Sequence, residues 1–556
     1  MTYSSTSEIL GKLCRSDRNL LGMLAGGALI SLVMGVVLGL LTAMIRTGAM
    51  AAEPQTGYRF MTGHGVSVFF YWLYFAQIAL LLGLAATQRQ ASPRLALRPL
   101  AWAGLGLMAA GFLGNMAGTW AGSPLLYDGS PDLAGDGMWQ AGLFYGGYSL
   151  LAAGLFFLAI SAIATTLGAK REDSEGSWST IGFAVTAWSG LVMVSSLAIL
   201  YTFLPAAAWA FGFAPEPAHH ATGWHLLFHN LHYLPLMGTV IAWYALIEDM
   251  TGAGSIFGRR FSKAIFTLYL VFVPPTSLYH MFLEPDLSPM LRGLGSLLSL
   301  FISVPTIGVF LVIVISMEAR ARAQGARGLF GWLRVQPWNE PAMMAIAMAV
   351  VNLALGGVFA FVLIQEKLAP LASDTFFVPA YFHFLTIGTV TLTLLGAFAW
   401  FLPAFTGRAL RGKALLRLLP ITLTAGIAIF GGAGMIAGLR GMPRRTLDVS
   451  YDGTAPQLWA AVSPYLGIGA AIMGLSLLAF AIILVVSARG SPAIRERPHD
   501  RGAGPKTVDM GLVLNQPSWT APACILVLVL AMYAATAIAF ALLGSLPLAS
   551  VAGAAH

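Results

Sequence analysis

Residues 378–407 read VPAYFHFLTIGTVTLTLLGAFAWFLPAFTG. This stretch contains no Asp, Glu, Lys or Arg, and it exceeds the about 20 apolar residues that a helix needs to cross a bilayer. It nevertheless carries one imidazole, His383, in its first third. A polar ring at membrane depth requires a partner. The stretch therefore predicts a transmembrane helix whose histidine contacts a polar group or a cofactor.

The same apolar character recurs along the whole chain. Of its 556 residues, 57% are hydrophobic and 10% are charged, whereas a soluble protein carries about 25% charged residues. Helices are expected, because backbone groups in a bilayer must be satisfied within the segment. We predict an all-α polytopic membrane protein, a single domain over residues 1–556, with about 13 transmembrane helices at residues 19–45, 64–87, 99–121, 137–168, 178–204, 223–248, 262–283, 290–317, 340–366, 376–404, 415–439, 459–487 and 519–545. A polar connection at residues 488–518, rich in Arg, Pro and Gly, is expected to be a cytoplasmic loop.

The positive charges alternate from one loop to the next. If the N-terminus is cytoplasmic, 24 of the 31 Lys and Arg residues fall on the cytoplasmic side and 7 on the outer side. Cytoplasmic loops of membrane proteins carry such an excess, so the pattern supports a cytoplasmic N-terminus and thirteen spans. It also accounts for the net charge of +8 without a nucleic-acid partner. Cys14 and Cys524 lie far apart in the sequence, which excludes a thiolate metal site within this chain.

Six of the ten histidines fall at one depth of the predicted bundle. They lie toward the outer ends of four helices and are His64, His225, His229, His232, His280 and His383. Neutral imidazole is a common metal ligand, and it also ligates heme iron from a helix. The alternative is a set of hydrogen-bonded structural histidines, but chance scatter would also place histidines at inner ends. The layer therefore predicts a metal or heme site near the outer surface of the membrane.

Three of these histidines share one face of the predicted helix at 223–248. His225, His229 and His232 stand at positions i, i+4 and i+7, and Tyr233 follows His229 by four residues. Two interpretations stay open for this stripe. It holds a metal, or His225 and His232 line a polar cavity.

A basic pair, Arg444-Arg445, falls on the outer side, where positive charge is disfavoured. Guanidinium groups match carboxylates in geometry, so the pair indicates an anion, and heme propionates fit. The alternative is an ordinary surface pair.

Several motifs also follow one another in order along most of the chain. They are His64-Gly-Val, Tyr279-His-Met-Phe-Leu-Glu-Pro-Asp through Ser303-Val-Pro-Thr, Gly328-Leu-Phe-Gly-Trp-Leu-Arg with Pro337-Trp-Asn, Val378-Pro-Ala-Tyr-Phe-His383 through Trp400-Phe-Leu-Pro-Ala-Phe-Thr-Gly407, and Met442-Pro-Arg-Arg445. Taken together, they resemble subunit I of the heme-copper oxygen reductase superfamily, and within it the B-type oxidases.

The resemblance implies a low-spin heme, expected to be heme b. His64 and His383 match its two axial ligands, and such a heme only transfers electrons because no coordination position stays open. Arg444 and Arg445 match the doublet that binds the propionates.

The resemblance also implies a copper site and a proton channel. His229 and His280 match two copper ligands, and Tyr233 matches the tyrosine that oxidases join to the first of these histidines. Tyr244 and Thr306 fall at or near polar positions of the single proton channel of B-type enzymes.

Two positions depart from the family pattern, and both belong to the reaction centre. Tyr279 replaces one copper ligand, and Tyr381 replaces the proximal ligand of the high-spin heme. In a first hypothesis the centre is rebuilt, with Tyr381 as a phenolate ligand and His225 or His232 as the missing copper ligand. In a second the centre is lost and one heme remains. In a third Tyr279 and Tyr381 hydrogen-bond to each other in an emptied cavity.

The expected function is that of a membrane heme oxidoreductase that passes electrons to an altered heme/metal centre and reduces O2 or NO. The alternative is a non-catalytic one-heme relative that acts in electron transfer or gas sensing. Whether the chain is an enzyme, and whether a second heme and copper are present, stays open. The resemblance further implies a subunit II-type electron-donor partner, cytochrome c or a quinol, contact with membrane lipid, and a place in the bacterial inner membrane.

Overall fold

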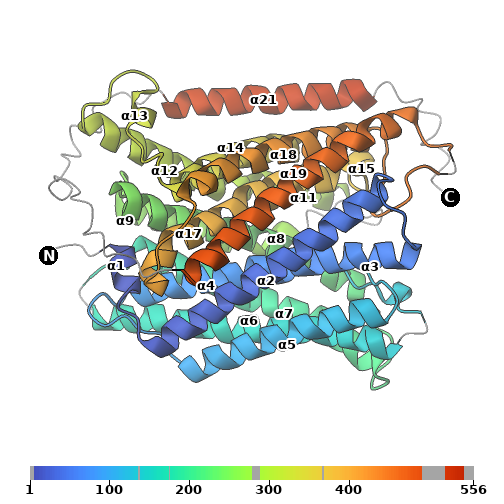
Figure 1. The fold of residues 1–556 in the computed structure, drawn as a ribbon, viewed down its shortest axis with the longest axis horizontal. Coiled ribbons are helices and arrows are strands. Elements are labelled where there is room, and N and C mark those ends of the chain that lie inside the picture. Colours follow the sequence, from blue (N-terminus) through green and yellow to red (C-terminus); the bar gives the residue numbers. More distant parts are fainter. Residues whose placement is uncertain are drawn as a thin grey trace.

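The computed structural model describes residues 5–135, 138–173, 176–277, 288–365, 368–451, 453–490 and 520–543. Within these ranges the secondary structure is helical, apart from an isolated bridge between Thr375 and Pro443. Most of the long helices run in a similar direction across the molecule and form a bundle around one buried apolar core (Figure 1). The elements are α1 (Thr6–Leu10), α2 (Arg15–Arg46), α3 (Pro54–Gly65), η1 (Val66–Trp72), α4 (Leu73–Thr87), α5 (Arg98–Ala121), η2 (Pro131–Leu133), α6 (Met138–Glu172), α7 (Thr180–Ala210), α8 (His220–Thr251), α9 (Gly258–Phe272), η3 (Pro274–Ser277), α11 (Pro289–Phe301), α12 (Ser303–Ala323), α13 (Gly331–Arg334), α14 (Pro341–Leu363), α15 (Ala369–Ala372), α16 (Phe377–His383), η4 (Phe384–Thr391), α17 (Leu392–Thr406), α18 (Lys413–Leu439), α19 (Gln457–Ala488) and α21 (Thr520–Leu543).

The prediction of an all-α polytopic membrane protein is confirmed. Among the described residues, 11 helical stretches are long and apolar enough to cross a membrane. The predicted spans at 223–248 and 262–283 correspond to α8 and to α9 with η3, although the second runs beyond the described residues. The count of thirteen and the cytoplasmic N-terminus stay predictions, as do the single domain and the loop at 488–518, most of which lies outside the described part.

Two composite spans lie at the centre of the bundle. In the most apolar stretch of Pro54–Thr87, 94% of the residues are buried, and in that of Phe377–Thr406 the share is 72%. In the corresponding stretch of α2 only 33% of the residues are buried. A helix that is enclosed on all sides can direct polar side chains only into internal space. These two spans carry His64 and His383.

Both central spans change from α- to π-helix directly after their histidine. The π-helical segments are η1, which begins two residues after His64, and η4, which begins one residue after His383. Such segments are rare and occur frequently at functional sites. Their last residues are joined, because the buried Trp72 Nε1 donates to Thr391 Oγ1 at 2.9 Å. This bond fixes the axial position of one span against the other.

Small residues allow α18 to approach the helix that carries His383. A side-chain carbon at Gly434 would lie 2.8 Å from Ala380 Cβ, and one at Gly438 would collide with the backbone of Phe377. Helices in a membrane pack closely where small residues repeat along one face. The glycines of α18 therefore determine where α16 lies.

We expect Gly438→Ala to separate α18 from α16. Overpacking of this kind costs about 1–3 kcal/mol of stability, and it should lower the melting temperature of the detergent-solubilised protein. Gly432→Ala on the same helix is the control, because a side-chain carbon there would have no neighbour within 4 Å. Equal melting temperatures for the two variants would show that this close approach is unimportant.

Candidate cofactor site

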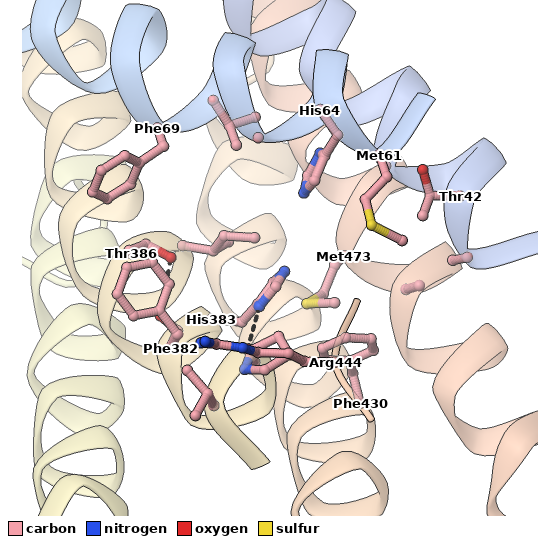
Figure 2. Close-up of a pocket in the computed structure, with 18 of the residues that line it drawn as sticks. Thr42, Met61, His64, Phe69, Phe382, His383, Thr386, Phe430, Arg444 and Met473 are labelled. Carbon is pink, nitrogen blue, oxygen red and sulfur yellow. Dashed lines mark hydrogen bonds between the residues drawn. The ribbon is translucent and has the colours of Figure 1, made fainter. Parts of the chain in front are cut away.

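A cavity of about 340 Å³ lies between the two central spans and α2. Three of the six histidines predicted to share one layer line this cavity, together with the basic pair. Its lining includes His64, His232, Tyr381, Phe382, His383, Arg444 and Arg445. Residues that are more than 300 positions apart in the sequence thus meet around one internal space (Figure 2).

The ring of His64 is oriented by the backbone of α2. Its Nδ1 atom lies 2.8 Å from the carbonyl oxygen of Gly35. Donation from Nδ1 to this oxygen selects the tautomer in which Nε2 carries the lone pair, the form that binds a metal. Gly39, one turn further along α2, leaves space for the ring, since a side-chain carbon there would lie 2.6 Å from Nδ1.

The ring of His383 is oriented in the same way by its own helix. Its Nδ1 atom lies 2.5 Å from the carbonyl oxygen of Pro379, and its ring packs 4.9 Å from that of Phe430. Figure 2 shows the rings of His64 and His383 extending from opposite sides of the cavity with their nitrogens toward each other. Both imidazoles therefore present Nε2 to the same space.

The two arginines of the basic pair line the cavity from the loop between α18 and α19. Arg444 Nη2 lies 2.7 Å from Asp374 Oδ1, and Arg445 Nη1 lies 2.8 Å from Asp128 Oδ2. In both side chains the Nε atom is buried and has no hydrogen-bond acceptor among the described residues. Each guanidinium thus keeps a donor for a further anionic group.

Arg445 stays positively charged in this position. Burial acts to lower the pKa of Arg445, but the neighbouring Tyr127 and Asp128 outweigh burial and raise this pKa above its ordinary value. The aromatic ring of Tyr127 also lies 5.6 Å from the guanidinium carbon. Arg445 is therefore a permanent positive charge in the lining of the cavity.

Tyrosine and histidine side chains occupy the region next to the two facing imidazoles. Tyr381 lines the cavity, and Tyr233 follows His232 on α8, with the two ring centroids 5.9 Å apart. The ring of His232 meets Phe382 edge-on, with ring centroids 4.1 Å apart. Three imidazoles, those of His64, His232 and His383, therefore line one cavity.

Comparison with known proteins is consistent with this arrangement. Residues 19–474 match the family model described as cytochrome c and quinol oxidase polypeptide I. The chain belongs to this family. It is 27% identical over 492 residues to cytochrome c oxidase subunit 1 of Thermus thermophilus, which covers 85% of each protein. It is also 25% identical over 280 residues to cytochrome c oxidase subunit 1 of Alkalihalophilus pseudofirmus, which covers 47% of this chain and 41% of that protein.

The fold of this oxidase subunit I family member agrees with a solved structure. A chain from a cryo-EM structure of a heme-copper terminal oxidase dimer aligns with a TM-score of 0.79 over 94% of this chain and 93% of that chain. The two sequences are 20% identical in this alignment, so the likeness concerns the fold. The predicted membership in the heme-copper oxidase subunit I family is confirmed, and so is the predicted transmembrane helical fold. The general role of an oxidoreductase in electron transport follows from this family.

Members of this family normally bind hemes and copper, and the cavity residues of this chain fit a heme. Two Nε2 atoms face one space, Gly39 provides room for the His64 ring, and the buried Nε atoms of Arg444 and Arg445 are available to carboxylates. These features suit two axial ligands and two propionates. Each feature belongs to a residue of this chain, and none depends on the relatives.

The copper-site predictions lie mostly beyond the described side chains. His225 and His229 belong to α8, but their side chains are not described, and Tyr279 and His280 lie outside the described residues. Within the described ranges there is no group of three or more His, Cys, Asp or Glu residues that could hold a metal. The metal roles of His225, His229, His232 and His280 stay predictions.

Several hydroxyl groups of α8, α9 and α12 are hydrogen-bonded to one another outside the cavity lining. Tyr244 donates to Ser262 at 3.0 Å, and Ser262 donates to Ser255 at 2.8 Å. The hydroxyl groups of Tyr269 and Thr306 lie 2.8 Å apart. Tyr244 and Thr306, singled out from the sequence, therefore each belong to a hydrogen-bonded group of hydroxyls, and the two groups are separate.

Several residues that shape the site were not predicted from the sequence. They include Gly35 and Gly39, which receive the His64 ring, and Asp374 and Asp128, which pair with the arginines. The spacing Gly35-x-x-x-Gly39 is a known signal for close helix packing and was available in the sequence. The partner of each arginine comes from a distant loop, and no local pattern marks it.

We expect His64→Ala and His383→Ala each to abolish the reduced low-spin heme spectrum. Each variant removes one of the two nitrogens that face the cavity, and one remaining ligand leaves a coordination position open. The measurement is a reduced-minus-oxidised spectrum of the purified protein at low temperature. A spectrum that survives either substitution would refute the ligand assignment.

We expect Gly39→Ala to displace the His64 ring without removing any ligand. The added carbon would lie 2.6 Å from Nδ1. Overpacking of this kind lowers the free energy of unfolding by about 1–3 kcal/mol. The heme content per chain should fall and the low-spin absorption band should broaden. Gly26→Ala on the same helix has no neighbour within 4 Å and should behave as the wild type.

Proposed function

We propose that this chain is the heme-bearing subunit of a membrane oxidoreductase that resembles a B-type terminal oxidase. In this proposal His64 and His383 hold a low-spin heme b, and Arg444 and Arg445 bind its propionates. Electrons pass from this heme to an altered heme/metal centre where O2 or NO is reduced. The observation that carries the proposal is the pair of imidazoles that face one cavity, each with Nδ1 committed to a backbone carbonyl.

The chemistry of the proposed low-spin site follows from its ligands. A heme with two axial histidines supplies one-electron transfer and leaves no position for a substrate. The backbone carbonyls of Gly35 and Pro379 orient the two rings. Arg444 and Arg445 would neutralise the propionates, and the buried aromatic side chains around the cavity would exclude water. Reduction of a substrate therefore requires a second centre.

We propose that the second centre lies at Tyr381 and Tyr233. The resemblance of the sequence places Tyr381 at the position of a proximal heme ligand, and a phenolate is able to fill that role. Tyr381 and Arg444 line the same cavity. In this proposal Tyr279 also contributes to the centre, and His229, His280 and either His225 or His232 hold a second metal, expected to be copper.

The second candidate function is a one-heme protein for electron transfer or gas sensing. It is supported by Tyr279 and Tyr381, which stand where the family resemblance expects histidine ligands. Both positions belong to the reaction centre, and neither belongs to the low-spin site. In that case the low-spin site is complete and the second heme and copper are absent.

The proposed surroundings follow from the family. We propose a bacterial inner membrane location with lipid around the bundle, and a subunit II-type partner that delivers electrons from cytochrome c or from a quinol. The hydroxyl series from Ser255 through Ser262 to Tyr244, with Tyr269 and Thr306, would serve as a proton path.

The decisive measurement is the cofactor content of the purified protein. A catalytic oxidoreductase should contain two hemes per chain by pyridine hemochrome assay and one copper by elemental analysis. Tyr381→Phe should reduce the heme content to one per chain, because phenylalanine cannot ligate iron. Tyr465→Phe, which changes an exposed tyrosine of α19, should keep both hemes.

The alternative predicts different values from the same assays. One heme and no copper in the wild type, with no loss in Tyr381→Phe, would replace the catalytic proposal by the one-heme protein. Absence of any heme from a well-folded preparation would overturn both.

A further inference from the structure

Arg46, the last residue of α2, is a buried arginine that no family resemblance singled out. It is 7% exposed, and it lines the same cavity as the facing imidazoles. Its guanidinium donates to the backbone carbonyl oxygens of Pro443 and Thr446, and Nη1 lies 3.5 Å from the carbonyl oxygen of Arg444. One side chain therefore spans the backbone on both sides of the basic pair.

The loop with the basic pair is also tied to the segment before α16. Thr375 and Pro443 form a backbone bridge, Phe376 N donates to Met442 O at 2.7 Å, and Arg444 N donates to Asp374 O at 3.2 Å. The guanidinium carbon of Arg46 lies 4.4 Å above the ring of Phe376. Arg46 thus contacts both segments of this junction at once.

We propose that Arg46 is a positioning residue that holds Arg444 and Arg445 in place for the anionic groups of the cofactor. This inference rests on the proposed heme site. In this proposal Arg46 links the three elements that form the site. These are α2, which orients His64, the segment before α16, which precedes His383, and the loop of the basic pair.

The geometry requires arginine rather than any positive charge. A planar guanidinium presents several donors in a fixed arrangement, and it packs flat on an aromatic ring, whereas a lysine ammonium is a single point charge. At the end of α2 a positive charge is also favoured by the helix dipole. Lysine at position 46 would keep the charge but lose the simultaneous bonds to Pro443 and Thr446.

The first test needs no cofactor. In Arg46→Lys and Arg46→Met, the amide of Arg444 should exchange with deuterium about tenfold faster than in the wild type, since charged hydrogen bonds that hold its loop are lost. The control is Arg59→Lys, because Arg59 Nη2 donates to a single carbonyl oxygen, that of Gly122 at 3.0 Å, outside the cavity lining. Unchanged exchange at Arg444 in both Arg46 variants would overturn the inference.

The second test uses the heme-loaded protein and separates position from charge. Arg46→Lys should accelerate heme loss to a scavenger protein by about tenfold and shift the midpoint potential of the low-spin heme. If Arg46 acted only through its charge, Arg46→Lys would leave both quantities at wild-type values, and the proposal would be wrong.

A double-mutant cycle completes the test. On a background of Arg444→Gln and Arg445→Gln, the further change Arg46→Lys should have little added effect on heme loss, because coupled residues are not additive. Full additivity would contradict the positioning role. If the wild type holds no heme, the proposed function fails, and the exchange rates at Arg444 still decide whether Arg46 holds the loop.

Discussion

The structure depends on two imidazoles that face each other inside a membrane bundle. A histidine ring in hydrocarbon is unfavourable unless both nitrogens have partners. The Nδ1 atoms of His64 and His383 find theirs in backbone carbonyls, one from a neighbouring helix and one from the same helix. The Nε2 atoms turn to a common cavity, where both lone pairs are available to a group bound between them.

This constraint explains why the two central spans are held so closely. Opposed rings are useful only if the two helices keep their axial and lateral positions to within a fraction of a turn. The bond from Trp72 to Thr391 sets the axial position, and the glycines of α2 and α18 set the lateral distances. The arginines of the loop between α18 and α19 then add charge at one end of the cavity.

The sequence alone predicts those features of the structure that depend on hydropathy and on the distribution of charge. The apolar segments, His64 and His383 at one depth, and Arg444-Arg445 on the outer side all follow from composition and periodicity. The π-helical segments do not, because a window of apolar residues such as 384–391 has the same hydropathy whether its bonds close after four or five residues. The clamp from Arg46 to Pro443 could not be predicted either, since it joins residues almost 400 positions apart through backbone atoms that carry no sequence signal.

The separation of His64 from His383 has a consequence for how the protein is made. Residues 64–72 enter the membrane early in synthesis, whereas residues 383–391 and the basic pair emerge only after most of the chain has been translated. The first imidazole therefore waits with its cavity side unsatisfied until the tenth predicted span arrives. If the chain carries the proposed heme, its insertion would thus be a late assembly event, and a chain truncated before residue 383 would expose an incomplete pocket to the quality-control proteases of the membrane.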